Sequence, residues 1–228
     1  MRTLAIGDIH GCLTALRVLE RTVPLRAEDS LIVLGDMVDR GPDSSQVLDW
    51  AIERHEQGRL IALRGNHEIM MLEAKRNPRN LGYWLEVGGR QTLKSYGDNA
   101  TLADVPDRHW EFLEQLQPWS QTETHIFVHG SVYANLPLEE QPDYKLYWEG
   151  ISSFDSRHDS GKTVIAGHLS QKSGLPLHLG CAICIDTWAY GAGWLTCLDV
   201  ETGRYWQANQ RGESRSGWID ELDGSARR

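Results

Sequence analysis

The chain has 228 residues, of which 40% are hydrophobic, so one domain can bury a core without disulfides or a structural metal. The formal net charge of −9 argues against an extended nucleic-acid surface, because such a surface needs a basic face for the phosphates. The N-terminal residues lack the apolar stretch of a secretory signal, and no apolar run approaches the length of a membrane span. We therefore expect a cytoplasmic protein with no nucleic-acid or membrane partner, acting as a monomer.

Short apolar runs rich in Ile, Val and Leu predict buried strands, because each run ends abruptly in a polar cluster. In chain order, TLAI precedes GDIHG, LIVL precedes GDMVDRG, LIAL precedes RGNHE, HIFV precedes HGS, and TVIA precedes GH. Residues 12–23 and 43–58 lie between the first three runs, and their apolar spacing of three and four residues predicts helices. The repeated order of strand, loop and helix favours α/β layering.

Residues 68 to about 120 have a different pattern, with IMMLEAKR, YWLEVGGRQTLKSYG and DRHWEFLEQL indicating a helical insertion before the sheet resumes. Strands dominate after residue 160, and LDVETGRYWQ is typical of a hairpin with its turn at Glu-Thr-Gly. The last residues are polar. We predict one domain over residues 1–206, followed by a frayed polar tail over residues 207–228.

Polar side chains gather at the ends of the five predicted strands. In an open α/β sheet the carboxyl ends of strands are where sites form, so we expect these side chains to face one crevice. They are Asp8 and His10; Asp36, Asp39 and Arg40; Arg64, Asn66 and His67; His129; and His168.

Asp, His and Asn together suit intermediate divalent metals such as Mn, Fe or Zn. Six candidates exceed the needs of one ion, namely Asp8, His10, Asp36, Asn66, His129 and His168. We therefore predict two divalent ions, most readily Mn²⁺, with Asp36 in the middle of the set as their bridge. Two metals about 3.5–4 Å apart can hold a hydroxide between them as nucleophile and clamp a phosphoryl oxygen.

The remaining polar residues have no metal role in this interpretation. We expect His67 to protonate the leaving oxygen and Asp39 to hold its imidazole. Arg40, together with Asn66, is expected to contact the phosphate oxygens of the substrate. We expect Arg64 to brace the site, and Glu68 to begin the next helix, where its charge suits the N-terminal dipole.

An isolated Gly-Asp or Gly-His pair at a strand end is usually turn chemistry, and a lone histidine is usually a cap or a surface residue. The joint pattern is much more specific, because three signatures in fixed order each follow an apolar run. Together, GDIHG, GDMVDRG and RGNHE resemble the phosphoprotein phosphatase branch of the calcineurin-like metallophosphoesterases, in its small bacterial and phage form. The resemblance covers roughly residues 2–200.

This resemblance implies a two-sheet β-sandwich flanked by helices, with two metals and direct hydrolysis of phosphomonoesters, often of phospho-Ser/Thr in proteins. By motif position, Asp8, His10 and Asp36 resemble the ligands of the first metal. Asp36, Asn66, His129 and His168 resemble those of the second, His67 with Asp39 resembles the acid dyad, and Arg40 resembles the phosphate-binding arginine.

The sequence departs from that family at one place. A second phosphate-contacting arginine usually follows a Trp between the last two histidine ligands, whereas here Glu149 follows Trp148. Lys145 and Arg157 are the candidate substitutes. A carboxylate beside a phosphate is repulsive unless a cation intervenes, so we expect Glu149→Arg to raise activity on an aryl phosphate if Glu149 faces the site.

Two other functions remain open. A sister family hydrolyses dinucleoside polyphosphates symmetrically, but it usually has Gln where His10 stands and Asn where Asp39 stands. A catalytically silent metal-binding module is the other alternative, although every expected ligand is intact. The leading interpretation is a serine/threonine protein phosphatase acting on a phosphoprotein or phosphopeptide.

Several other residues receive structural interpretations. Cys181 and Cys184 are expected to be buried strand thiols, and the tryptophans to belong to the core or to a groove wall. Tyr190 is a candidate to overhang the site, and Asp186 a candidate to orient a ligand histidine. Solvated or structural positions are expected for His55, His109, His125, His158 and His178.

Overall fold

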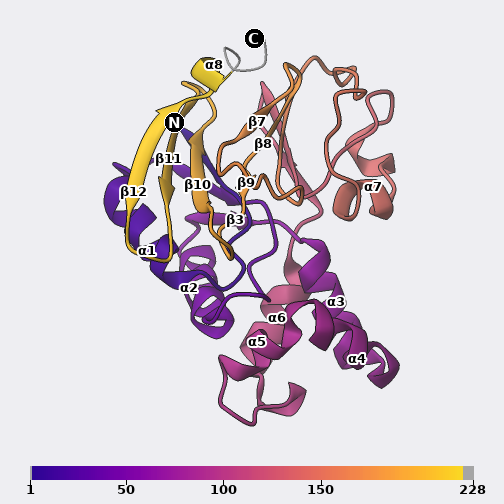
Figure 1. The fold of residues 1–228 in the computed structure, drawn as a ribbon. Coiled ribbons are helices and arrows are strands. Elements are labelled where there is room, and N and C mark those ends of the chain that lie inside the picture. Colours follow the sequence, from indigo (N-terminus) through magenta and orange to yellow (C-terminus); the bar gives the residue numbers. More distant parts are fainter. Residues whose placement is uncertain (1, 223–228) are drawn as a thin grey trace.

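The computed structural model describes residues 2–222, which form two facing β-sheets with helices outside them (Figure 1). One sheet has seven strands in the order β12-β11-β10-β1-β2-β3, with β9 paired to β10, and the other has five in the order β4-β5-β6-β8-β7. The predicted sandwich is therefore confirmed. The first sheet contains β1 (Thr3–Ile6), β2 (Ser30–Val33), β3 (Leu60–Ala62), β9 (Asp186–Thr187), β10 (Trp194–Asp199), β11 (Arg204–Ala208) and β12 (Ser214–Trp218). The second contains β4 (Trp119–Gln121), β5 (His125–Val128), β6 (Thr163–Ala166), β7 (Leu177–His178) and β8 (Ala182–Cys184).

The strands that precede the polar clusters run parallel. In the first sheet β1 pairs with β2 and β2 with β3, so that Ile6 lies opposite Val33 and Val33 opposite Ala62. In the second sheet β5 and β6 are parallel, with Val128 opposite Ala166. Because parallel strands end on the same side, both sheets present their carboxyl ends at one edge of the sandwich.

Apolar layers explain why these short strands form. Ile32, Phe127 and Leu198 are buried between the two sheets. The outer face of the seven-stranded sheet is covered by α1 (Leu13–Thr22) and α2 (Ser44–Glu56), whose buried residues follow the predicted spacing of three and four. With helices on one side and a second sheet on the other, the central strands are buried on both faces.

The helical insertion is also confirmed, and it extends below both sheets in Figure 1. The chain returns to the sandwich through a bridge between Leu63 and Gln117. Its elements are α3 (Asn66–Arg76), η1 (Pro78–Asn80), α4 (Leu81–Trp84), a π-helical turn η2 (Leu85–Gly89), α5 (Arg90–Lys94), η3 (Leu102–Asp104) and α6 (Asp107–Gln115). Before β6, η4 (Leu138–Glu140) and α7 (Asp143–Tyr147) lie beside the second sheet.

The expected hairpin is formed by β10 and β11, but the prediction of a frayed tail is wrong for residues 214–222. Strand β12 pairs antiparallel with β11, and α8 (Ile219–Leu222) follows it. Ile219 is buried with the residues between the sheets. The strand was missed because its side chains are mostly exposed and polar, while its order comes from backbone hydrogen bonds to β11. Residues 223–228 of the predicted tail lie outside the described residues.

Within residues 2–222, no helix has both the length and the apolar character that crossing a membrane requires. The four cysteines are free. Cys184 is buried in β8 as expected, whereas Cys181 lies just before that strand and is only half-buried.

Candidate metal centre

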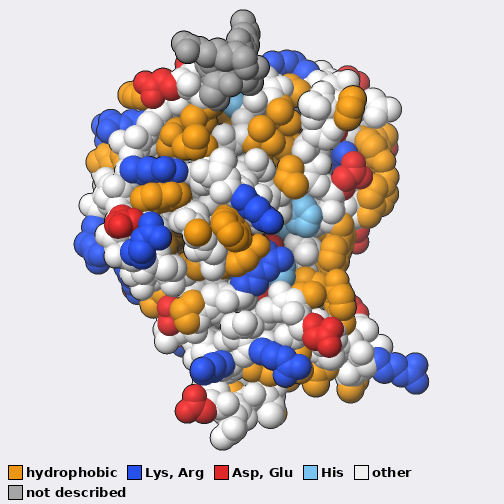
Figure 2. All heavy atoms as spheres, viewed as in Figure 1, with side chains coloured by type: hydrophobic (Ala, Val, Ile, Leu, Met, Phe, Trp, Pro, Cys, Tyr) orange, Lys and Arg blue, Asp and Glu red, His pale blue; other side chains and the backbone are white. Residues whose placement is uncertain are grey.

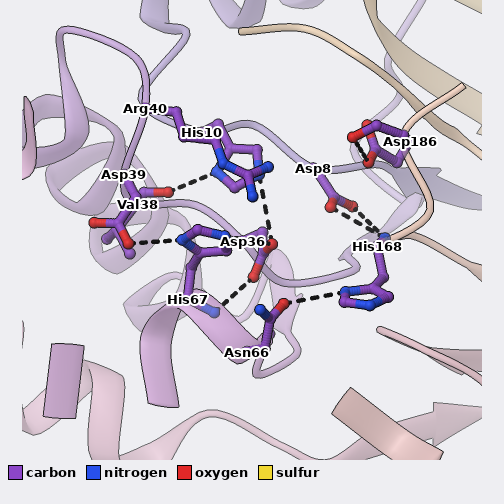
Figure 3. Close-up of polar contacts among 12 residues, drawn as sticks. Asp8, His10, Asp36, Val38, Asp39, Arg40, Asn66, His67, His168 and Asp186 are labelled. Carbon is purple, nitrogen blue, oxygen red and sulfur yellow. Dashed lines mark hydrogen bonds and ion pairs between the residues drawn. The ribbon is translucent and has the colours of Figure 1, made fainter. Parts of the chain in front are cut away.

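The five strand ends bring the six predicted ligands together, and Figure 3 labels five of them: Asp8, His10, Asp36, Asn66 and His168. Asp36 lies between two groups, with its Oδ2 3.5 Å from His10 Nε2 and its Oδ1 3.5 Å from His129 Nε2. We call Asp8, His10 and Asp36 the first ligand cluster, and Asp36, Asn66, His129 and His168 the second. Each oxygen of Asp36 thus faces one cluster, as a bridging carboxylate requires.

The second ligand cluster is crowded with hydrogen-bond acceptors. Asn66 Oδ1 lies 2.9 Å from His129 Nε2 and 3.1 Å from His168 Nδ1, and the two ring nitrogens are 3.2 Å apart. The other nitrogen of each ring faces a backbone carbonyl: His129 Nδ1 is 2.9 Å from the oxygen of Leu34, and His168 Nε2 is 3.0 Å from that of Trp148. The carbonyls accept the ring protons, so three lone pairs converge with no proton between them.

Burial reinforces this arrangement by disfavouring imidazolium. It lowers the pKa of His10 and of His129, and burial together with the neighbouring His129 lowers the pKa of His168 to about 4. His10 follows the same rule as the other two rings, since its Nδ1 is 2.8 Å from the oxygen of Val38. Near neutral pH all three rings are uncharged and turn an unprotonated nitrogen inward, which is the form that binds metals.

The carboxylates of the site also call for a cation. Burial raises the pKa of Asp8 well above its ordinary value, and the carboxylates of Asp186 and Asp36 raise it further. A bound divalent ion would reverse that shift. Converging neutral histidines and crowded carboxylates fit two divalent ions in the predicted clusters.

The backbone at the site is strained. Among residues 2–222, six non-glycine residues have positive φ, and five of them are predicted site residues: His10, Asp36, Asp39, Arg40 and His168. Such conformations cost roughly 1–3 kcal/mol each and persist where the surroundings impose them. The glycine of RGNHE also has a steric reason, because a Cβ on Gly65 would lie 2.1 Å from Asp36 Oδ1.

The predicted dyad is formed by His67 and Asp39. His67 Nδ1 donates to Asp39 Oδ2 at 2.7 Å, which leaves its Nε2 facing the metal clusters, 3.9 Å from Asp36 Oδ2. Burial lowers the pKa of His67, but Asp36 and Asp39 together outweigh it and raise the pKa overall. His67 also lies within ligand reach of His10 and Asp36, so distance alone does not separate an acid from a ligand.

Arg40 and Tyr190 cover the first ligand cluster. The guanidinium NH1 of Arg40 is 3.0 Å from His10 Nε2, and its Cζ lies 4.6 Å above the ring of Tyr190. Tyr190 also packs edge-on against His10, at 4.9 Å between centroids. Tyr190 therefore lies over the first ligand cluster as expected, and its ring holds the guanidinium of Arg40 by a cation–π contact.

Glu68 has a structural role at the site that the sequence did not indicate. It is fully buried, and its carboxylate accepts the N–H groups of Asp36, Met37 and Val38 as well as that of Gly65. Burial and the charge of Asp36 raise its pKa to about 7. Glu68 thereby ties the loop that carries the bridging carboxylate to the start of α3. Its position in RGNHE was visible, but its distant N–H partners were not.

Two expected supporting roles are wrong. Arg64 faces the insertion, where its NH2 donates to the carbonyl of Glu114, so it does not brace the site. Asp186 does not orient a ligand histidine, because its carboxylate accepts from Ser170 Oγ and from the N–H of Trp188. Its contribution to the site is the charge that it adds near Asp8.

Neither candidate for the second phosphate-binding cation reaches the site. Lys145 is buried and donates to Glu149 Oε1 at 2.7 Å, with Asp155 3.6 Å away. Arg157 donates to the carbonyl of Gly161. Glu149 is paired with a lysine, so the expectation that it repels a phosphate is not supported by the geometry.

The other histidines and tryptophans mostly have the expected structural roles. His109 bonds Asp49 and Tyr96, and His158 bonds the carbonyl of Leu136. Trp110 is buried in the core. Trp84 is also buried, but it donates to the Asp39 carboxylate, a contact that its apolar neighbours in the sequence did not reveal.

A two-sheet sandwich with Asp, Asn and His side chains gathered at its strand ends has the architecture of the metallophosphoesterase class. The sequence profile of the calcineurin-like phosphoesterases matches residues 1–191, and this chain belongs to that family. The suspected family is thus confirmed.

Curated relatives have different substrates in their names. A symmetrical bis(5'-nucleosyl)-tetraphosphatase of Delftia acidovorans is 34% identical over 131 residues, covering 57% of this chain and 41% of that protein. Serine/threonine-protein phosphatase 1 of Salmonella typhimurium is 32% identical over 136 residues, covering 57% of this chain and 59% of its own. The matches span only about half of the length of these relatives, and they do not decide between the two activities.

A solved structure supports the fold over nearly the whole chain. The cold-active protein-tyrosine phosphatase of a psychrophilic Shewanella superposes with a TM-score of 0.59 at 18% identity, covering 94% of this chain and 80% of that one. At this identity, the likeness concerns the fold alone.

Proposed function

We propose that this protein is a phosphomonoesterase of the serine/threonine protein phosphatase type, with two divalent ions, Mn²⁺ first among them. The observation that carries the proposal is the His67–Asp39 dyad, buried beside the bridging Asp36 and next to Arg40. A phosphoserine or phosphothreonine ester has an alkoxide leaving group, which leaves poorly unless it is protonated, so its hydrolysis depends on a proton donor.

The residues of this chain divide the work. The two ligand clusters would hold the divalent ions, and these would supply an activated water nucleophile and polarise the phosphoryl oxygens. The Arg40 guanidinium binds phosphate oxygens, held by the ring of Tyr190. The carboxylates of Asp36 and Asp39 raise the pKa of His67 and so favour the imidazolium form, which carries protons on both ring nitrogens. Asp39 holds the Nδ1 proton, and His67 donates the Nε2 proton to the leaving oxygen.

An open groove beside Arg40 supports a large substrate. It encloses about 550 Å³ and is lined by Arg40, Tyr190 and the insertion residues 85–88, 90 and 91. Figure 2 shows histidine side chains reaching the surface in the middle of one face, beside Lys or Arg side chains. A phosphorylated residue on a protein could enter from this face without a lid having to open.

Symmetrical hydrolysis of a dinucleoside tetraphosphate is the second candidate. It is favoured by the 34%-identical relative and by Arg90 in the same groove, which could bind a further phosphate. His10 and Asp39 favour the protein phosphatase instead, because the sister family usually has Gln and Asn at these two positions.

The test uses metal-stripped protein supplied with Mn²⁺, Mg²⁺, Zn²⁺ or no metal. Each sample is assayed on p-nitrophenyl phosphate, a phosphoserine peptide and diadenosine tetraphosphate. We expect activity only with metal, highest with Mn²⁺, and a larger kcat/KM on the peptide than on the dinucleotide. Equal activity without metal would refute the metal-dependent reaction. A strong preference for the dinucleotide would refute the protein phosphatase in favour of the second candidate.

A further inference from the structure

The helical insertion contacts the acid dyad as well as the solvent. Trp84 Nε1 lies 3.1 Å from Asp39 Oδ1 and 3.0 Å from Oδ2, so the indole N–H donates to the carboxylate. Thr92 Oγ1 donates to Asp39 Oδ1 at 2.7 Å and accepts the N–H of the same residue at 2.8 Å. His67 supplies a further donor, at Oδ2.

All of these groups are almost completely buried. Trp84, Thr92 and Asp39 are 0% exposed, and His67 is 1% exposed. A buried carboxylate needs such donors, but one partner would leave it free to rotate about its Cβ–Cγ bond. The donors Trp84 and Thr92 bind the carboxylate from two further directions and fix that rotation. They thereby fix the orientation of the oxygen that accepts the Nδ1–H of His67.

The backbone of the insertion is shaped to make this contact. Trp84 lies in α4 and Thr92 in α5, on either side of a kink at Gly88, and both side chains reach Asp39. Gly88 has φ of 139°, and a Cβ there would lie 2.8 Å from both Arg40 N and Asp39 Cβ. Its carbonyl accepts the N–H of Arg40 at 3.3 Å. The π-helical turn that contains Gly88 thus lies directly against the strained Asp39–Arg40 backbone.

We propose that Trp84 and Thr92 are positioning residues for leaving-group protonation, because they hold Asp39 where it fixes the ring of His67. This inference rests on the proposed function, in which His67 is the proton donor. The insertion is then part of the catalytic apparatus of this chain and more than a cover for the sheet. A merely structural role would affect folding and every substrate alike.

Leaving-group dependence separates these two roles. p-Nitrophenolate leaves readily without a proton, whereas the alkoxide of a phosphoserine peptide does not. We expect Trp84→Phe to lower kcat on the peptide by about 10–100-fold, the range for partners that orient an active-site group. On p-nitrophenyl phosphate kcat should fall by less than about 3-fold, since protonation is dispensable there. KM should change little on either substrate, because Arg40 and the ligand clusters are intact.

Matched variants guard against a folding defect. Thr92→Val should reproduce the selective loss of activity on the peptide. Thr92→Ser, which keeps the hydroxyl, should retain the wild-type kcat on both substrates. Trp110→Phe is the control, because Trp110 is buried in the same insertion but packs on Lys75 and not on Asp39. An equal loss on both substrates, or the same loss in Trp110→Phe, would overturn the inference.

A second readout needs no activity. The Nδ1–H proton of His67, assigned by its absence in His67→Asn, can be followed by NMR in the metal-free protein. Its chemical shift should change in Trp84→Phe and in Thr92→Val but not in Trp110→Phe. An unchanged signal in all three variants would overturn the inference, whatever the activity of the wild-type protein. If the wild-type protein cleaved neither ester, that result would refute only the proposed function.

Discussion

The two ligand clusters are built in different ways. The first follows β1 and β2, adjacent parallel strands of one sheet, and the N–H of His10 donates to the carbonyl of Asp36 at 2.8 Å. The second takes Asp36 and Asn66 from that sheet but His129 and His168 from the ends of β5 and β6 in the other. The position of His10 in the first cluster depends on strand pairing, whereas the second cluster depends on how the two sheets pack, and so does Asp8, which accepts the N–H of His168.

Their charges differ as well. Arg40 lies against His10 in the first cluster, so its guanidinium already offsets part of the negative charge of that cluster. In the second cluster Asn66, His129 and His168 face one another with only lone pairs between them. The second cluster therefore needs a metal more than the first does, and its geometry is more sensitive to the packing of the two sheets.

Asp36 is the residue that the two clusters share, so its substitution should have the largest effect. Asp36→Asn keeps the shape of the side chain but removes the charge that both ions need. We expect kcat to fall by at least about 10³-fold, the upper range for removing one electrostatic stabiliser of a transition state. The measurement is kcat together with metal content by mass spectrometry. Retention of one ion at wild-type affinity would mean that Asp36 serves one cluster only.

His67 belongs to neither cluster in this interpretation. His67→Asn should lower kcat by about 10²–10⁴-fold, the range for a general acid, because the leaving oxygen loses its proton donor. Metal content should stay near that of the wild type, measured on the same samples. Loss of an ion would make His67 a ligand, as its proximity to His10 and Asp36 allows.

The packing of the sheets can be weakened without touching a ligand. Leu198→Ala removes volume between the sheets, and Leu16→Ala removes it from the outer layer; both side chains are 0% exposed. Each should cost about 2–5 kcal/mol of the free energy of unfolding. Only Leu198→Ala should also weaken the second ion, by about 10-fold, since the shell around a site tunes its affinity. Calorimetric titration measures both affinities, and equal weakening in the two variants would contradict the comparison.

The smallest effect is expected outside both clusters. Arg157→Ala removes an exposed side chain that donates to the carbonyl of Gly161. It should change KM for p-nitrophenyl phosphate by less than about 2-fold, as surface substitutions change energies by about 0.5 kcal/mol or less. A markedly higher KM would return Arg157 to the list of phosphate-binding residues.

Much of the site could be predicted because its residues directly follow apolar runs. Asp8, Asp36 and Asn66 stand a few residues after strands whose composition marks them as buried, and parallel strands end together. Side chains that meet through tertiary contacts were less accessible. Arg64 and Lys145 had suitable charges, yet each is bound elsewhere, to Glu114 and to Glu149. Strand β12 was missed because its stability comes from its pairing with β11.

The sequence by itself determined the strand ends, the ligand types and the family, because short apolar runs and the residues after them are local properties of the chain. Only the tertiary structure decided which partners hold those residues. Glu68 binds the loop of Asp36, Tyr190 holds Arg40, and Trp84 reaches Asp39 from the insertion. These contacts join residues far apart in the chain through the packing of sheets and helices, and no local pattern specifies which donor will meet which acceptor.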